Sequence, residues 1–63
     1  MAENFSCIQV GRLFVEGDSE FAKVYEKRIS HKYVLEEFDN KKATGVLDKN
    51  AFNRATKWAQ DNQ

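Results

Sequence analysis

The chain has 63 residues, and its ten Lys and Arg residues balance ten Asp and Glu residues, so the formal net charge is zero. A chain of this length is predicted to form one small domain over residues 1–63, with a thin core and marginal stability. One Cys and one His cannot supply an internal disulfide or a four-ligand zinc site, so the packing of apolar and aromatic side chains has to stabilise the fold.

The composition also predicts the compartment. No apolar run approaches the roughly 18–20 residues that a membrane span needs. The first residues, Met-Ala-Glu-Asn, lack the basic start and apolar stretch of a signal peptide. We therefore expect a cytoplasmic protein without membrane contact, in which a single reduced cysteine is ordinary.

The first predicted element is a β-strand over residues 5–15, a run rich in β-branched and aromatic residues. Its apolar positions change phase at Gly11, which is typical of a bulge or bend. Cys7 lies beside Ile8 in this run and is predicted to be a small core side chain. The stretch Glu16–Ser19 then predicts a turn.

The middle of the chain allows two interpretations. Residues 27–35 alternate between apolar and polar positions, as a strand does, but the Glu, Lys, Ala and Leu content of residues 20–38 also suits a helix. A strand over residues 5–15 needs hydrogen-bonding partners for its backbone. If residues 27–35 are extended, they and a short strand over residues 43–47, after a turn at Asp39–Lys42, provide those partners within one molecule.

The last predicted element is an amphipathic helix over Asp48–Gln60. Its apolar residues fall on one helical face, and they are Ala51, Phe52, Ala55, Trp58 and Ala59. Asp48 suits the N-cap position, where its carboxylate accepts hydrogen bonds from the first turn. Leu47 and Phe52 occupy the two positions of a hydrophobic staple.

Together these elements predict an α+β fold, in which a three-stranded antiparallel meander is packed by one C-terminal amphipathic helix. The alternative is a dimeric strand-helix-helix arrangement. In that arrangement the strand over residues 5–15 pairs with a second chain, because helical residues 20–38 cannot complete its ladder.

Catalytic groups do not converge in this sequence, so we predict that the protein is not an enzyme and holds no cofactor or metal. His31 directly follows Ser30, and adjacent side chains on a strand point to opposite faces, which separates a base from its nucleophile. Glu36 and Glu37 are adjacent too, so the same geometry prevents them from acting as a carboxylate pair. The three glycines are isolated from one another and form no phosphate-binding loop.

The segment Phe38–Phe52 resembles an EF-hand loop, with Phe-Asp at its start, a Gly followed two residues later by an aliphatic residue, and Phe in the following helix. Such a resemblance implies calcium binding when acidic ligands occupy the loop. With Gly45 at the sixth position, the third and twelfth positions hold Lys42 and Ala51. Neither side chain can bind calcium, so no calcium site is predicted.

The surface of the domain is therefore expected to carry its function. Our first hypothesis is a small protein-binding module, a regulator, adaptor or inhibitor of a larger protein, of the size common among bacterial and phage accessory proteins. Unpaired strand edges suit strand addition by that partner, or pairing between two copies of the chain. The predicted contact residues are Tyr33, Glu36, Asp39, Lys41 and Lys42.

The alternative hypothesis is a small nucleic-acid-binding module. Basic and aromatic residues that share one strand parity can contact phosphates and stack on bases, and here they are Lys23, Tyr25, Lys27, His31 and Tyr33. The zero net charge and the acidic run at Glu36, Glu37 and Asp39 disfavour this hypothesis, because a typical nucleic-acid-binding domain is basic.

Overall fold

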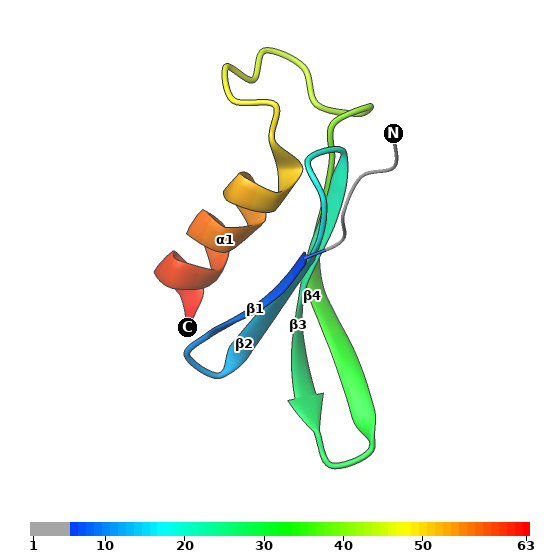
Figure 1. Cartoon of the computed structure of the whole chain (residues 1–63), viewed down its shortest axis with the longest axis vertical. Helices are drawn as coiled ribbons and strands as arrows, with labels where there is room; N and C mark the ends of the chain where they lie inside the picture. The colour runs from blue at the N-terminus through cyan, green and yellow to red at the C-terminus, as the bar shows by residue number, and fades with distance from the viewer. Residues whose placement is uncertain (1–5) are drawn as a thin grey trace.

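A computed structural model describes residues 6–63 and shows a four-stranded antiparallel sheet with a C-terminal helix on one face (Figure 1). The elements are β1 (Ser6–Val10), β2 (Leu13–Gly17), β3 (Phe21–Arg28), β4 (His31–Asp39) and α1 (Ala51–Asn62). Each strand pairs with the next along the chain, so β1 and β4 are the two edges of this sheet. The predicted α+β meander is confirmed, with four strands where three were expected.

The prediction of one strand over residues 5–15 is wrong, because the chain reverses at Gly11 and the residue after it. Val10 faces Leu13 across this two-residue turn. Gly11 has a φ of +60°, which glycine adopts without a steric penalty, and glycine is favoured as the first residue of such a hairpin turn. The phase change at Gly11 therefore marks a hairpin between two strands. Residue 5 lies outside the described residues.

β3 and β4 form a hairpin over residues 21–39, so the helix considered for residues 20–38 is wrong, and the strand-helix-helix arrangement with it. β3 pairs with β2 on one side and with β4 on the other. These two ladders satisfy the backbone hydrogen bonds of β3 within one molecule. Tertiary pairing thus overrides the helix-forming tendency of its Glu, Lys and Ala residues.

The tip of this hairpin interrupts the strand predicted over residues 27–35. Arg28 faces His31, and Ile29 and Ser30 form the turn between them. Ile29 has a φ of +49° and is fully exposed. A β-branched residue is strained in this left-handed region. Figure 1 shows the tip extending past the end of α1, so a strained apolar residue stands at the far end of the molecule.

Residues 40–50 connect β4 to α1 as an irregular segment, so the predicted strand over residues 43–47 is wrong. The position beside β3 that a third strand would take is occupied by β4. Leu47 is fully exposed, so it does not form the predicted staple with Phe52. A strand precedes this segment, so the helix-loop-helix arrangement of an EF-hand is not formed either.

Helix α1 begins a few residues later than predicted. Its N-cap is Asn50 and not Asp48, because the side chain of Asn50 accepts a hydrogen bond from the backbone N–H of Asn53 at 3.1 Å. The carboxylate of Asp48 instead accepts from the N–H of Asn50 at 2.9 Å. Asp48 therefore shapes the turn that leads into the helix. No helix within residues 6–63 has the length and apolar character to cross a membrane.

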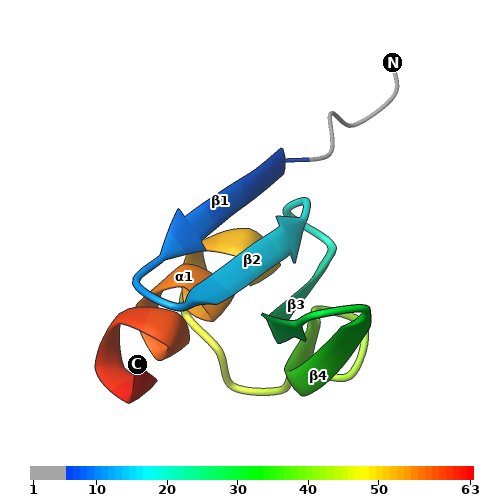
Figure 2. The same ribbon diagram turned by 90° about the horizontal axis from the view of Figure 1, so that it is seen from below.

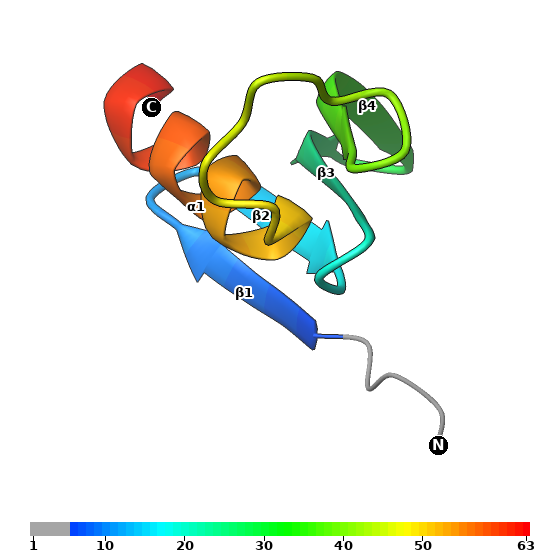
Figure 3. The ribbon, with the colours of Figure 1, turned by 90° about the horizontal axis from the view of Figure 1, so that it is seen from above.

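Helix α1 lies across one face of the sheet (Figures 2 and 3). The core lies between the two, and the predicted apolar face of the helix is confirmed. Fully buried residues of the core are Leu13, Val15, Ala22 and Val24 from the sheet and Ala51, Ala55 and Ala59 from the helix. Because these helix residues are alanines, α1 packs close to the sheet. Phe52 and Trp58 are partly buried against the same cluster.

Candidate functional site

The register of the hairpin decides which predicted site residues can lie together. The turn pairs Lys27 with Lys32, and successive strand residues point to opposite faces. Odd-numbered residues of β3 therefore share a face with even-numbered residues in the first half of β4. The residues of the predicted nucleic-acid surface separate accordingly: Lys23, Tyr25 and Lys27 point away from α1, and His31 and Tyr33 point to the helix side of the sheet. The expectation that all five share one face is wrong.

Tyr25 is buried on the sheet face opposite α1, where other side chains cover its ring. The rings of Phe14 and Tyr25 stack with their centroids 5.4 Å apart. The Nζ of Lys32 lies 4.4 Å from the Tyr25 centroid and 3.4 Å from Oε1 of Glu16. Only 4% of Tyr25 is exposed, so this residue is not available to stack on a base.

The hydroxyl of Tyr25 is less acidic than that of an ordinary tyrosine, because its pKa is raised. Burial of the side chain raises the pKa of Tyr25 from 10.0 to about 12, and its contact with Cys7 and the nearby charge of Glu16 add to the shift. The Sγ of Cys7 lies 3.7 Å from this hydroxyl. Cys7 itself is exposed, so its predicted place in the core is wrong.

This shift predicts a loss of stability in alkaline solution. Because the folded-state pKa of Tyr25 lies above the value of the unfolded chain, neutral Tyr25 stabilises the fold fully below pH 10, and that stabilisation is lost as the pH rises toward 12. We expect the melting temperature, followed by circular dichroism, to fall between pH 10 and pH 12. The fall should be smaller in Tyr25→Phe, and equal falls in the two proteins would contradict the assignment.

The residues predicted for protein binding lie along β4 and just after it. Tyr33, Glu36 and Asp39 belong to β4, and Lys41 and Lys42 follow it in the connecting segment. Every residue from His31 to Glu37 is exposed. Tyr33, Val34 and Leu35 remain 48%, 45% and 42% exposed, respectively. Within the described residues no strand pairs with the outer edge of β4, so three large apolar side chains stand beside an unpaired row of backbone groups.

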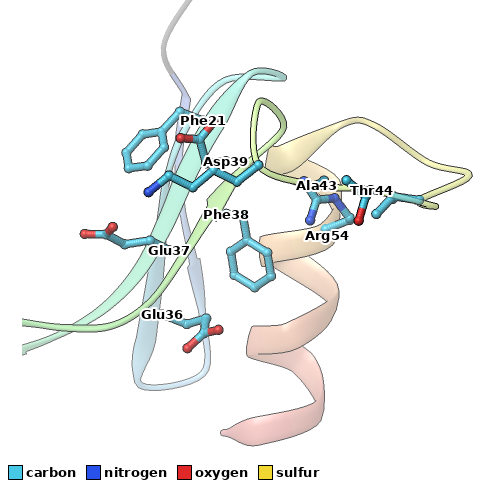
Figure 4. Close-up of a pocket in the computed structure, with 10 residues that line it drawn as sticks. Phe21, Glu36, Glu37, Phe38, Asp39, Ala43, Thr44 and Arg54 are labelled. Carbon is cyan, nitrogen blue, oxygen red and sulfur yellow. The ribbon is translucent and has the colours of Figure 1, made fainter.

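An open pocket of about 450 Å³ lies beside the base of β4 (Figure 4). Its apolar lining comes from Phe21, Phe38, Ala43 and Val46, and Glu36, Glu37 and Asp39 add carboxylates. Figure 4 shows Phe38 pointing toward α1, while Glu36 and Glu37 point in different directions. The predicted patch therefore divides, because Glu36, Asp39 and Lys42 line this pocket whereas Tyr33 and Lys41 do not.

Arg54 of α1 forms the helix side of this pocket. Its Nη2 donates a hydrogen bond to Oδ1 of Asn40, and its guanidinium lies 5.7 Å from the centroid of the Phe38 ring. The Nδ2 of Asn40 in turn donates to the carbonyl oxygen of Ser19 at 2.6 Å. These contacts tie the helix to the connecting segment and to the β2–β3 turn. The Nε of Arg54 is buried and has no hydrogen-bond partner among the described residues.

A β-bulge changes the faces of β4 halfway along the strand. Val24 faces Glu36 but Tyr25 faces Val34, so Leu35 is an extra residue without a partner in β3. The parity of β4 is therefore reversed beyond the bulge. Tyr33 and Glu36 point to the same face, although their numbers differ in parity. The alternation in the sequence gives no sign of this bulge.

Charge is separated along the β3–β4 hairpin. Lys27, Arg28 and Lys32 lie near its tip and outnumber Glu26 there, and Glu36, Glu37 and Asp39 lie near its base and outnumber Lys23 there. Arg28 Nε lies 3.3 Å from Oε1 of Glu26, and its side chain is 68% exposed. Lys32 is also only partly covered, at 45% exposure. The hairpin therefore has a basic end and an acidic end that both face solvent.

The described residues offer little for catalysis. Ser30 Oγ lies 3.4 Å from His31 Nδ1 at the hairpin tip, where both residues are exposed. The expected separation of these two side chains is therefore not observed, because Ser30 lies in a turn and not in a strand. No three His, Cys, Asp or Glu side chains of residues 6–63 gather as a metal site. Comparisons with protein-family models, curated proteins and solved structures found no match for the chain.

Proposed function

We propose that the protein is a small protein-binding module that takes up an extended segment of a larger partner along the outer edge of β4. One observation carries the proposal: β4 is exposed from His31 to Glu37, and Tyr33, Val34 and Leu35 lie next to its unpaired edge. An added strand would pair with the backbone of β4 and cover these apolar side chains. Such a module could act as a regulator, adaptor or inhibitor.

The charges and the pocket define the segment that fits this edge. The base of β4 combines an apolar pocket with the carboxylates of Glu36, Glu37 and Asp39, which outnumber the two cations of its lining, Lys42 and Arg54. It therefore suits a segment that carries an apolar residue next to a basic one. The tip of the hairpin is basic, so the other end of the segment should be acidic or neutral. Complementary charges of this kind select partners and set the direction of the added strand.

The observations favour a protein partner over nucleic acid. Glu26 lies within 3.3 Å of both Arg12 and Arg28, and Glu16 lies 3.4 Å from Lys32. These carboxylates would face the phosphates that the neighbouring cations bind. The buried ring of Tyr25 also removes one of the two aromatic groups from the predicted base-stacking surface.

Peptide selection tests the proposal without knowledge of the natural partner. We expect a random peptide library displayed on phage to yield extended peptides that shift the backbone amide resonances of β4 in NMR spectra. Leu35→Lys should weaken their binding by at least about tenfold, because it removes a central apolar contact. Ile8→Lys is the matched control at the other sheet edge, since Ile8 is 39% and Leu35 42% exposed, and it should change binding less than about twofold.

Other results would contradict the proposal. If the selected peptides shift β1 instead of β4, or if Ile8→Lys weakens binding as much as Leu35→Lys, the edge of β4 is not the binding site. If no peptide is selected while the protein binds heparin and single-stranded oligonucleotides, with affinity that falls steeply as salt rises, the nucleic-acid alternative replaces the proposal. Circular dichroism of each variant verifies that it is folded.

A further inference from the structure

We infer that the strand that fits the edge of β4 is β4 of a second copy of the chain, in an antiparallel pairing that places the Ile29 tip of each copy in the pocket of the other. This inference rests on the proposed function to the extent that both use the outer edge of β4. The interface is the same patch on both chains, so it closes as a two-fold dimer and leaves no unpaired end for further β4 addition.

The bulge makes β4 complementary to itself. In antiparallel strands, directly opposed residues lie on the same face. Because parity reverses at Leu35, Tyr33 shares a face with Glu36, and Lys32 shares the other face with Glu37. An antiparallel register that sets Lys32 opposite Glu37 of the second copy also sets Tyr33 opposite its Glu36. The two-fold axis then passes between Val34 and Leu35, so the exposed apolar residues of both copies meet at the centre.

Charge supports this antiparallel direction. Lys27, Arg28 and Lys32 outnumber Glu26 near the tip, which gives a net charge of +2, and Glu36, Glu37 and Asp39 outnumber Lys23 near the base, which gives a net charge of −2. An antiparallel pair places the tip of each copy beside the base of the other, where the opposite charges attract. A parallel pair would place tip beside tip and base beside base, which like charges oppose.

In this register the hairpin tip of one copy also lies next to the pocket of the other copy. His31 lies opposite Phe38 of the second copy, so Ile29 continues past Phe38 toward the pocket that Phe38, Ala43 and Val46 line. The tip cannot fill the pocket of its own chain, because Ile29 and the first pocket residue of β4, Glu36, are separated by about 23 Å of extended strand. Ile29 is fully exposed and strained at a φ of +49°. Strained residues of this kind cluster at functional sites, which supports a contact role for the Ile29 side chain.

The first test is the mass of the protein in solution. We expect sedimentation equilibrium to give twice the chain mass of 7.3 kDa at high concentration, with dissociation favoured by added salt. Ile29→Asn should raise the dimer dissociation constant by at least about tenfold. Asn tolerates a positive φ better than Ile, so this variant should fold at least as well. Leu47→Asn is the matched control, because Leu47 is equally exposed but lies outside the paired edge, and it should change the constant less than about twofold.

The second test exchanges charges between two chains. Lys32→Glu and Glu37→Lys should each be monomeric alone, because like charges then oppose each other across the axis. A mixture of the two variants should form a heterodimer, visible in native mass spectrometry, because each Glu again faces a Lys. Lys32→Glu also loses the contact with Glu16, but damage to one chain cannot explain association that appears only on mixing.

Three outcomes would overturn the inference. The chain could stay monomeric at millimolar concentration, or its dimer could persist in Ile29→Asn and Glu37→Lys. The dimer could also dissociate in Ile8→Lys but not in Leu35→Lys, which would place the interface at the other sheet edge. If the chain is monomeric yet binds the selected peptides along β4, the inference fails and the proposed function stands. If the dimer forms as described and no peptide competes with it, the inference stands and the proposed function fails.

Discussion

Gly17→Ala should remove most of the stability of the fold at 25 °C. Gly17 ends β2 with a φ of +144°, and a Cβ placed there would lie 2.3 Å from the carbonyl oxygen of Phe21 and 2.5 Å from the Cα of Ala22. Both are backbone atoms of β3, so they cannot rotate away. Ala22 pairs with Gly17 and belongs to the core. We expect a loss of more than about 3 kcal/mol, against a total stability of roughly 3–5 kcal/mol for a domain of this size.

Urea unfolding followed by circular dichroism measures this effect, and Gly45→Ala is its control. Gly45 also has a positive φ, of +69°, but a Cβ there would meet no atom within 4 Å. Its replacement should cost only the backbone strain, about 1–2 kcal/mol. If Gly17→Ala unfolds at no lower urea concentration than Gly45→Ala, the close approach of β2 and β3 at this position is wrong.

Leu13→Ala should destabilise the fold by about 2–4 kcal/mol. Leu13 is fully buried, and its side chain is among the largest that the core encloses completely. The helix faces this core with alanines, and an alanine has no side-chain torsion with which to fill a cavity. The gap left by the shortened side chain should therefore persist.

Chemical unfolding of Leu13→Ala and Leu47→Ala separates burial from side-chain chemistry. The same atoms are removed in both variants, but Leu47 is fully exposed in the segment between β4 and α1. Leu47→Ala should change the free energy of unfolding by less than about 0.5 kcal/mol. Similar losses in the two variants would show that Leu13 does not lie in the core.

The helix could be predicted from the sequence because its period repeats over several turns, and the structure buries the alanines of that face. The sheet was harder to predict, because two of its turns carry weak signals. In the β1–β2 turn, Gly11 is followed by Arg12 and not by the Asn, Asp or Ser that identifies a hairpin turn in a sequence. The β3–β4 turn begins with a β-branched residue, Ile29. Local propensity opposes Ile at a positive φ. Only the pairing of β3 with β4 places it there, and a single sequence does not reveal that pairing.

The candidate site was predictable in its location but not in its arrangement. The turn after β4 and the acidic residues before it drew attention to Glu36 and Asp39, which line the pocket. Val34 and Leu35 were missed, although an apolar run in a strand that lies at a sheet edge is the signal that identifies them. The separation of Lys23 from Tyr33 could not be foreseen, because it depends on the turn at Ile29, which alternation alone cannot locate.

The alanine stripe of α1 has a consequence for how the molecule opens. Ala51, Ala55 and Ala59 give the helix a close fit but little apolar area, and Phe52 and Trp58 are only partly buried. All the fully buried side chains lie between α1 and the sheet, so detaching α1 uncovers the whole core, including Leu13, Val15 and Val24. The helix and the sheet should therefore open as one cooperative unit in native-state fluctuations, because a single-layer sheet without α1 has no covered apolar face.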